Sequence, residues 1–246
     1  MIKGIIFDYG GTIDTDSIHW AEVIWKGYQK LNVNVTKELF RMAYVHAERT
    51  LAKFPLVKPE HNFLNLMNIK IDIQTSFLVD AGFWKDMEGK EKERKRVSEL
   101  IANFCYQFVL DNLMVSKPVI KQMADKFPLV LVSNFYGNIN TILNDFKLNL
   151  FQFVIESAVV GVRKPDPRIF QLGVEKLKIM PNEVIVVGDS YKKDIIPANA
   201  IGCKTVWIKG VGWDQKEQPD LTLPDAVINS IKLLPQVVND IVNNES

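Results

Sequence analysis

Five short apolar runs along the chain predict the strands of a buried sheet. They cover residues 2–7, 129–132, 151–155, 183–187 and 204–208. The runs are rich in β-branched and aromatic residues and are nearly continuous rather than alternating, which is typical of parallel strands covered on both faces. Helix-length segments at residues 139–146, 167–177 and 195–201 separate the last four runs. Alternating strands and helices predict a parallel α/β sheet with right-handed crossovers.

The segment between the first and second runs has a different pattern. From Ile13 to about Ser116 it shows helical spacing of apolar residues and little strand signal. An insertion of this length predicts a second, helical domain. We therefore expect a core of residues 1–13 plus 116–246 and a helical cap of residues 14–115. Inside the cap, the charges of residues 86–96 nearly cancel, which favours a solvated helix start over a binding patch.

The end of the chain predicts one further helix. Residues 226–238 read as a closing helix that frays into residues 239–246.

Composition and charge exclude several classes of protein. Thirty Lys and Arg against 29 Asp and Glu leave a formal charge of +1, which gives no electrostatic footprint for nucleic acid or an anionic membrane. No apolar run is long enough for a spanning helix, and Asp8 interrupts the first run too early for a signal peptide. Two cysteines are too few for a disulfide framework. We expect a cytoplasmic protein, monomeric or dimeric, with no nucleic-acid or membrane partner.

Polar residues follow four of the predicted strands where each apolar run ends. Asp8-Tyr9-Gly10-Gly11-Thr12 follows the first, Ser133-Asn134 the second, Gly161-Val162-Arg163-Lys164-Pro165-Asp166-Pro167 comes just after the third, and Gly188-Asp189-Ser190 with Asp194 follows the fourth. Ligands of an open parallel sheet bind beyond the carboxyl ends of its strands. Carboxylate oxygens suit magnesium, and cationic and neutral donors suit phosphate oxygens. The pattern therefore predicts a magnesium–phosphate site.

These four motifs, with a helical insertion after the first, resemble those of the haloacid dehalogenase superfamily over essentially the whole chain. The insertion is similar to the small helical caps of the phosphoglycolate phosphatase and pyrimidine nucleotidase type. The resemblance implies a Rossmann-like α/β core with an inserted helical cap. It also implies a magnesium-dependent hydrolase that acts on a small phosphorylated metabolite.

The resemblance implies a role for each matching residue. Asp8 would be the nucleophile that becomes an aspartyl phosphate. Ser133 and the backbone around Asn134 would cradle the phosphoryl group, and Lys164 would offset charge between nucleophile and phosphate. The magnesium ligands would be Asp8, the carbonyl of Gly10 and Asp189, with Asp194 supporting them.

Gly10 departs from the pattern of the phosphatases in this superfamily. They carry a second Asp at this position, which acts as general acid and then as general base. Glycine keeps a carbonyl for magnesium but cannot move a proton, and loss of such a group costs on the order of 10²–10⁴ in rate.

Several interpretations accommodate Gly10. A weakly basic leaving group, as in an acyl phosphate, needs no acid; otherwise Asp14, Asp16 or His19 could reach the site. Phosphonoacetaldehyde hydrolases also carry a small residue here and form a Schiff base on a cap lysine, for which Lys53 and Lys58 are the candidates. A degenerate relative that binds without turnover would tolerate glycine as well, and so would a carbon–halogen hydrolase. The Gly188-Asp189 pair disfavours carbon–halogen chemistry.

Overall fold

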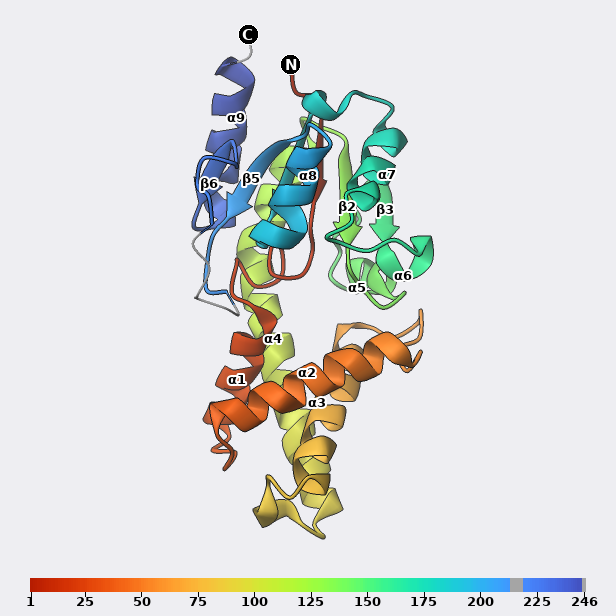
Figure 1. Ribbon diagram of the computed structural model, residues 1–246, viewed down its shortest axis with the longest axis vertical. Coiled ribbons are helices and arrows are strands. Elements are labelled where there is room, and N and C mark those ends of the chain that lie inside the picture. Colours follow the sequence, from red (N-terminus) through yellow and green to blue (C-terminus); the bar gives the residue numbers. More distant parts are fainter. Residues whose placement is uncertain (213–218, 245–246) are drawn as a thin grey trace.

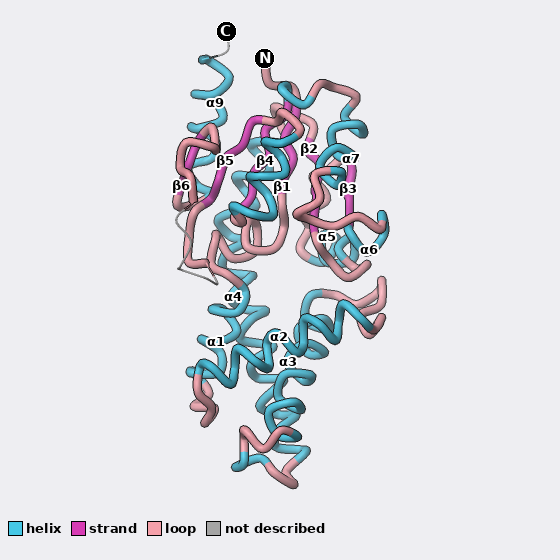
Figure 2. The backbone as a smooth tube through the Cα atoms, viewed as in Figure 1, coloured by secondary structure: helices cyan, strands magenta, loops and turns pink. Residues whose placement is uncertain are grey.

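Six parallel strands form one sheet in the part of the chain that the computed structural model describes, residues 1–212 and 219–244. They are β1 (Gly4–Phe7), β2 (Leu129–Ser133), β3 (Phe153–Glu156), β4 (Val184–Gly188), β5 (Lys204–Ile208) and β6 (Ala226–Ile228). Their order is β3-β2-β1-β4-β5-β6; Figure 1 labels β2, β3, β5 and β6, and Figure 2 labels all the strands. The predicted parallel α/β fold is confirmed. The strand order reverses between β1 and β4, and in this class of fold the ligand crevice lies at that point.

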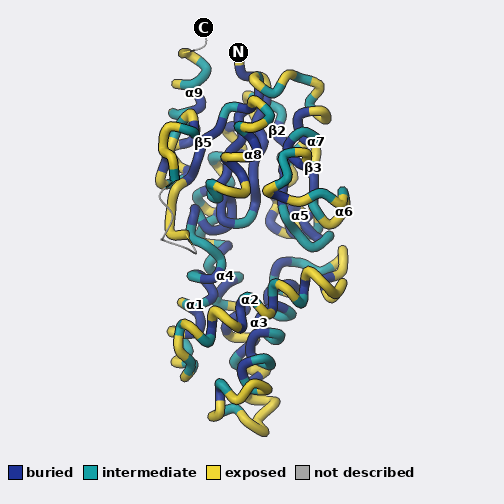
Figure 3. Tube along the Cα trace, viewed as in Figure 1, coloured by how far each residue is buried: buried dark blue, intermediate teal, exposed yellow. Residues whose placement is uncertain are grey.

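Side chains of the central strands alternate between two apolar cores, one on each face of the sheet. On one face, Ile6 and Val186 pack with residues of α7 (Arg168–Leu177) and α8 (Ile196–Ala200). On the other face, Ile5 and Val187 pack with residues of α4 (Glu91–Ala124), α5 (Ile139–Asp145) and α9 (Leu234–Asn244). Burial on both sides explains why these strands are continuously apolar in sequence (Figure 3).

The C-terminal segment corrects the prediction of one helix over residues 226–238. Ala226–Ile228 is the edge strand β6, paired in parallel with β5 in the register Val206↔Ala226. Asp225 explains the difference, because its carboxylate accepts a hydrogen bond from Thr205 N and pairs with Lys204, which sets the next residues alongside β5. After a 3₁₀ turn, Ile231–Leu233, helix α9 runs to Asn244 rather than fraying at residue 239. Residues 245–246 lie outside the described part.

Four helices form the insertion after β1, and they lie below the sheet in Figure 1. They are α1 (Trp20–Lys30), α2 (Lys37–Lys53), α3 (Phe63–Asp80) and the first part of α4, with a 3₁₀ turn at Lys85–Met87 before α4. Local capping fixes two of the starts: Leu39 N donates to Thr36 Oγ1, and Asn62 and Asn65 form a reciprocal capping box. None of the helices in the described residues is long and apolar enough to cross a membrane.

Helix α4 joins the cap to the core without a break. Its 34 residues extend through the proposed cap end at residue 115, and its last turns pack against the sheet through Ile120 and Met123. The charged run at its start is solvated, as predicted, except at Arg94, which is 3% exposed. The Arg94 guanidinium donates to Asp72 Oδ1 at 2.7 Å and to the Glu91 carboxylate, which ties α4 to α3.

Candidate active site

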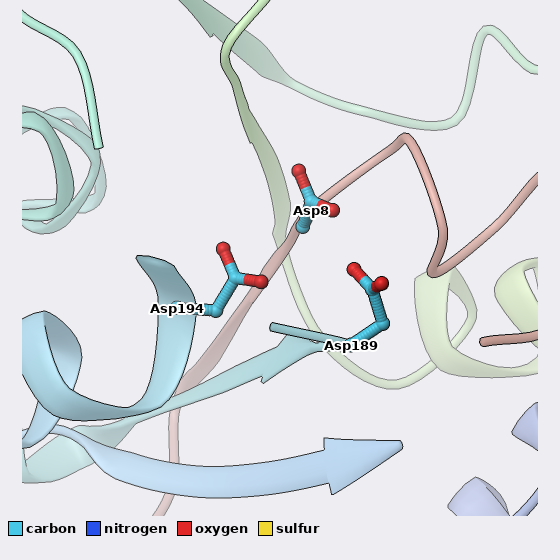
Figure 4. A group of neighbouring side chains, drawn as sticks. All are labelled: Asp8, Asp189 and Asp194. Atoms are coloured by element: carbon cyan, nitrogen blue, oxygen red, sulfur yellow. The ribbon is translucent and has the colours of Figure 1, made fainter. Parts of the chain in front are cut away.

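Three carboxylates meet at the carboxyl ends of β1 and β4. Asp8 directly follows β1, Asp189 directly follows β4, and Asp194 lies in the π-helical turn Tyr191–Ile195. Figure 4 shows the three side chains next to one another. One oxygen from each lies within 4.8 Å of the others. Ser133, the last residue of β2, is buried and lines the same cavity.

Lys164 places the predicted positive charge between two of these carboxylates. Its Nζ donates to Asp8 Oδ1 at 2.5 Å and to Asp194 Oδ1 at 2.7 Å, and the side chain is buried. Burial alone would lower the pKa of Lys164, but the charges of Asp194 and Asp8 outweigh it and raise that pKa. Asn134 holds the lysine in place, because Lys164 N donates to Asn134 Oδ1 and Asn134 Nδ2 donates to Lys164 O.

Negative charge exceeds positive charge in this cluster. Burial, followed by repulsion from Asp8, raises the pKa of Asp189 well above its ordinary value. Burial is also the largest of the effects that raise the pKa of Asp194 to about 6. Three converging carboxylates with one lysine among them form a hard-oxygen donor set that fits a divalent cation such as Mg²⁺.

The loop after β1 brings one further polar group to the cluster, the hydroxyl of Thr12, which had no predicted role. Thr12 Oγ1 donates to Asp8 Oδ2 at 3.2 Å and lies 3.4 Å from Asp189 Oδ1. Gly11 permits this approach, since its φ is +97° and a Cβ there would lie 2.3 Å from Asp189 Oδ2. The Asp8–Thr12 segment is therefore folded tightly against Asp189.

Comparison with known protein families identifies the family of this chain. The model of the haloacid dehalogenase-like hydrolases matches residues 2–202. The chain belongs to this family.

Curated relatives of this hydrolase match it over shorter stretches. A glyceraldehyde 3-phosphate phosphatase of Pyrococcus furiosus is 35% identical over 96 residues, 39% of this chain and 37% of that protein. A phosphoserine phosphatase of Thermus thermophilus is 36% identical over 77 residues, 30% of this chain and 31% of that protein. The chain thus spans less than half the length of these relatives.

Solved structures of low sequence identity share the whole fold of the hydrolase. A dehalogenase is 18% identical with a TM-score of 0.62, and each chain is covered to 96%. A HAD phosphatase from Thermococcus onnurineus is 20% identical with a TM-score of 0.51, covering 96% of this chain and 98% of that one. At these identities the likeness concerns the fold alone.

Of the three residues considered as substitutes for an acid at position 10, the structure favours Asp14. It is buried and lines the cavity, where Trp20 Nε1 donates to its Oδ2 at 3.0 Å and Gly11 N donates to its Oδ1 at 2.7 Å. Burial is the largest cause that raises the pKa of Asp14 to about 7. The indole that binds Asp14 also lies beside Gly10, because a Cβ on Gly10 would lie 3.9 Å from Trp20 Nε1.

The other two candidates, Asp16 and His19, form contacts that hold the fold. Asp16 accepts hydrogen bonds from Ser230 Oγ and Ile231 N, and it does not line the cavity. His19 does line the cavity, but its Nδ1 accepts the hydrogen bond from Ala21 N that caps α1. Burial, reinforced by the charge of Lys193, lowers the pKa of His19 to about 4. A neutral His19 has no excess proton to give near neutral pH.

A cavity of about 1000 Å³, partly open to solvent, lies over the carboxylate cluster between the core and the cap. Its cap side includes Trp20, Phe63 and a buried lysine, Lys70 of α3. The lysines considered from the sequence, Lys53 and Lys58, are exposed and do not line it. The sequence analysis did not identify Lys70 as a cavity residue. A lysine between apolar residues on one face of α3 is a pattern that could have indicated a buried functional lysine.

Proposed function

We propose that this hydrolase is a magnesium-dependent phosphatase that transfers the phosphoryl group of a small phosphorylated metabolite to Asp8 and then to water. The observation that carries the proposal is the position of Asp8, which lines the cavity between core and cap beside Lys164 and Asp189. The phosphatase names of the partial relatives support the same reaction class.

In this proposal, the side chains divide the work of the first step. An oxygen of Asp8 attacks phosphorus, which forms an aspartyl phosphate as the ester bond breaks. Lys164 offsets the negative charge shared by Asp8 and the phosphoryl group, and the Ser133 hydroxyl donates to a phosphoryl oxygen. Asn134 contributes backbone groups, because its side-chain amide is engaged by the main chain of Lys164.

Magnesium would be held by Asp8, the carbonyl oxygen of Gly10 and Asp189. Asp194 supports this set from behind, because its Oδ1 accepts from Lys164 and its Oδ2 accepts from Ser190 N. Magnesium held there would supply positive charge that stabilises the developing charge on the phosphoryl oxygens.

Asp14 would supply the proton that Gly10 cannot. As the ester bond breaks, the Asp14 carboxyl gives its proton to the leaving oxygen; in the second step its carboxylate takes a proton from the attacking water. Its burial favours the protonated form before the first step, and the bond from Trp20 fixes its orientation. This assignment accounts for a working site that lacks an acid at position 10.

The test follows magnesium-dependent hydrolysis of acetyl phosphate and of a sugar phosphate by wild type and Asp8→Asn. Turnover of both substrates, abolished by the substitution, is the expected result. Turnover of acetyl phosphate alone would retain Asp8 as nucleophile and would contradict a proton donor in the site. Unchanged phosphate release by Asp8→Asn would contradict the proposal itself.

Gly10 keeps one alternative function in view, a relative that binds phosphate and metal without turnover. Absence of Asp8-dependent turnover in wild type, together with strong turnover in Gly10→Asp, would establish it. The Schiff-base alternative has weaker support. The only cap lysine among the described cavity residues, Lys70, is paired with Glu48, and an ammonium group is not a nucleophile. Failure of borohydride to trap a carbonyl substrate on the protein would exclude it.

A further inference from the structure

An ion pair lines the cavity from its cap side, whereas the carboxylate cluster lines it from the core. Lys70 Nζ of α3 lies 2.7 Å from Glu48 Oε1 of α2. The core completes the arrangement, because Tyr136, in the loop after β2, donates from its hydroxyl to Glu48 Oε2 at 2.9 Å. Lys70 Nζ also lies 5.2 Å from the centre of the Tyr136 ring. All three residues line the cavity.

The two charges of this pair cancel. Burial opposes ionisation of Glu48, but the charge of Lys70 outweighs it and lowers the pKa of Glu48. Burial likewise opposes the ammonium form of Lys70, but Glu48 raises the pKa of Lys70 well above its ordinary value. Both groups are therefore ionised near neutral pH. Lys193 of the core also acts on Glu48, but Lys193 is exposed, so solvent screens its charge.

The cap walls near this pair are apolar or neutral, whereas the core side of the cavity carries three exposed lysines, Lys192, Lys193 and Lys209, whose charges solvent screens. Trp20 and Phe63 contact each other with ring centres 5.4 Å apart, and Leu66 and Met67 extend the apolar wall along α3. His19 is uncharged near neutral pH because burial lowers its pKa. A substrate group that reaches the cap wall therefore meets aromatic faces and one compensated ion pair, with the charges of Lys192, Lys193 and Lys209 held on the solvent-exposed core side.

From this arrangement we infer that Glu48 and Lys70 select substrates whose leaving group is uncharged and carries hydroxyl groups, such as a phosphorylated polyol or sugar. A hydroxyl group can donate to a carboxylate and accept from an ammonium group at once. A carboxylate or second phosphate would bring a third charge to a pair that has none to spare. Solvent offsets the cost of that charge only in part, because the Lys70 side chain is 9% exposed although that of Glu48 is 35% exposed. The inference rests on the proposed function, since it concerns the substrate of that same site.

Two matched pairs of compounds test the inference. Glycerol 3-phosphate and 3-phosphoglycerate differ by a terminal alcohol against a carboxylate, and sorbitol 6-phosphate and 6-phosphogluconate differ in the same way on a longer chain. Their dissociation constants are measured by calorimetry with Mg²⁺ in the Asp8→Asn protein, which holds substrate without turnover. We expect the alcohol member of at least one pair to bind roughly tenfold tighter or more.

Substitution of one or the other member of the ion pair should shift the ratio of the two dissociation constants in opposite directions. Glu48→Gln leaves Lys70 uncompensated and should shift the ratio roughly ten- to a hundredfold toward the carboxylate compound, whereas Lys70→Met should shift it the other way. The double variant should return near the starting ratio. Glu99→Gln, at an exposed position of α4, is the matched control and should leave the ratio unchanged.

The outcomes separate the inference from the proposed function. Tighter binding of the carboxylate member in both pairs, or no shift of either ratio in Glu48→Gln and Lys70→Met, would overturn the inference. Opposite shifts in two variants cannot come from partial unfolding, which would weaken both members of a pair together. Loss of turnover is judged separately, by wild type against Asp8→Asn on acetyl phosphate.

Discussion

Asp14 and Gly10 make the sharpest prediction about the chemistry. If Asp14 protonates the leaving oxygen, Asp14→Asn should slow the first turnover of an alkyl phosphate by about 10²–10⁴, which corresponds to about 3–5 kcal/mol of barrier. Acetyl phosphate should lose less than about tenfold in this step, because its leaving group is weakly basic. The assay is rapid-quench measurement of alcohol or acetate release at enzyme concentrations above those of the substrate.

The second step gives an independent signature. Hydrolysis of the aspartyl phosphate needs a base, so Asp14→Asn should release a burst of acetate from acetyl phosphate and then turn over slowly. The phosphorylated form on Asp8 should accumulate and be detectable by mass spectrometry of the quenched protein. A purely structural role of Asp14 would slow both substrates equally and would produce no burst.

Gly10→Asp is the matched rescue. Apart from its two chain neighbours, the nearest atom to a Cβ at this position would be Trp20 Nε1 at 3.9 Å, the same atom that binds Asp14. A carboxyl group introduced there can therefore use the same donor. We expect Gly10→Asp to restore alkyl phosphate hydrolysis by tenfold or more in the Asp14→Asn background. Equal first-turnover losses on alkyl and acetyl phosphate, with no rescue, would refute the reasoning.

Three further predictions concern the charges of the site. Mg²⁺ at 100 times its dissociation constant should stabilise the protein by about 2.7 kcal/mol, and Asp189→Asn should abolish the rise in Tm. Lys164→Met should destabilise the metal-free protein by about 3–5 kcal/mol at pH 8, because Asp8 and Asp194 lose their buried partner. Part of this loss should return at pH 5, because burial already raises the pKa of Asp194 to about 6 and that carboxylate then takes up a proton. The pKa of Asp14 is about 7 in the folded protein and about 4 in the unfolded chain. The contribution of its protonation to the free energy of unfolding is therefore full below pH 4 and is lost as pH rises through 7. Denaturant titrations of the metal-free proteins measure the free energy of unfolding. Between pH 4 and pH 8 this free energy should fall by up to about 4 kcal/mol more in wild type than in Asp14→Asn. An equal pH dependence in the two proteins would contradict the raised pKa of Asp14.

The sheet was predictable because its central strands have no polar face. Each of these strands is buried between two apolar cores, so a short continuous apolar run identifies it regardless of its neighbours. The edge strand β6 lacked that signal, since Ala226–Ile228 is three residues long and Val227 is 40% exposed. Its conformation depends on pairing with β5 and on the bonds of Asp225, which are tertiary contacts that local sequence does not reveal.

The carboxylate cluster could likewise be predicted from the sequence, whereas the Glu48–Lys70 ion pair could not. Parallel strands end at one edge, so residues that follow β1, β2 and β4 are brought together by topology, and their order in sequence is enough to find them. Glu48 and Lys70 lie on two separate helices, and their meeting with Tyr136 depends on how the cap packs against the core. Helical periodicity gives each helix a buried face, but it does not say which residues of that face line a cavity.

Position 10 shows how far a motif alone can guide an interpretation of the chemistry. Matching by spacing finds no acid at position 10, and a non-catalytic protein follows as one interpretation. The fold supplies what spacing does not, because the turn Gly11–Asp14 returns a carboxylate to Gly11 N and to an indole that also borders Gly10. The reaction requires a carboxyl group within reach of the leaving oxygen. In a tight loop, a side chain at position 10 and one at position 14 can both bring a carboxyl group to that point. The rescue of Asp14→Asn by Gly10→Asp tests that equivalence directly.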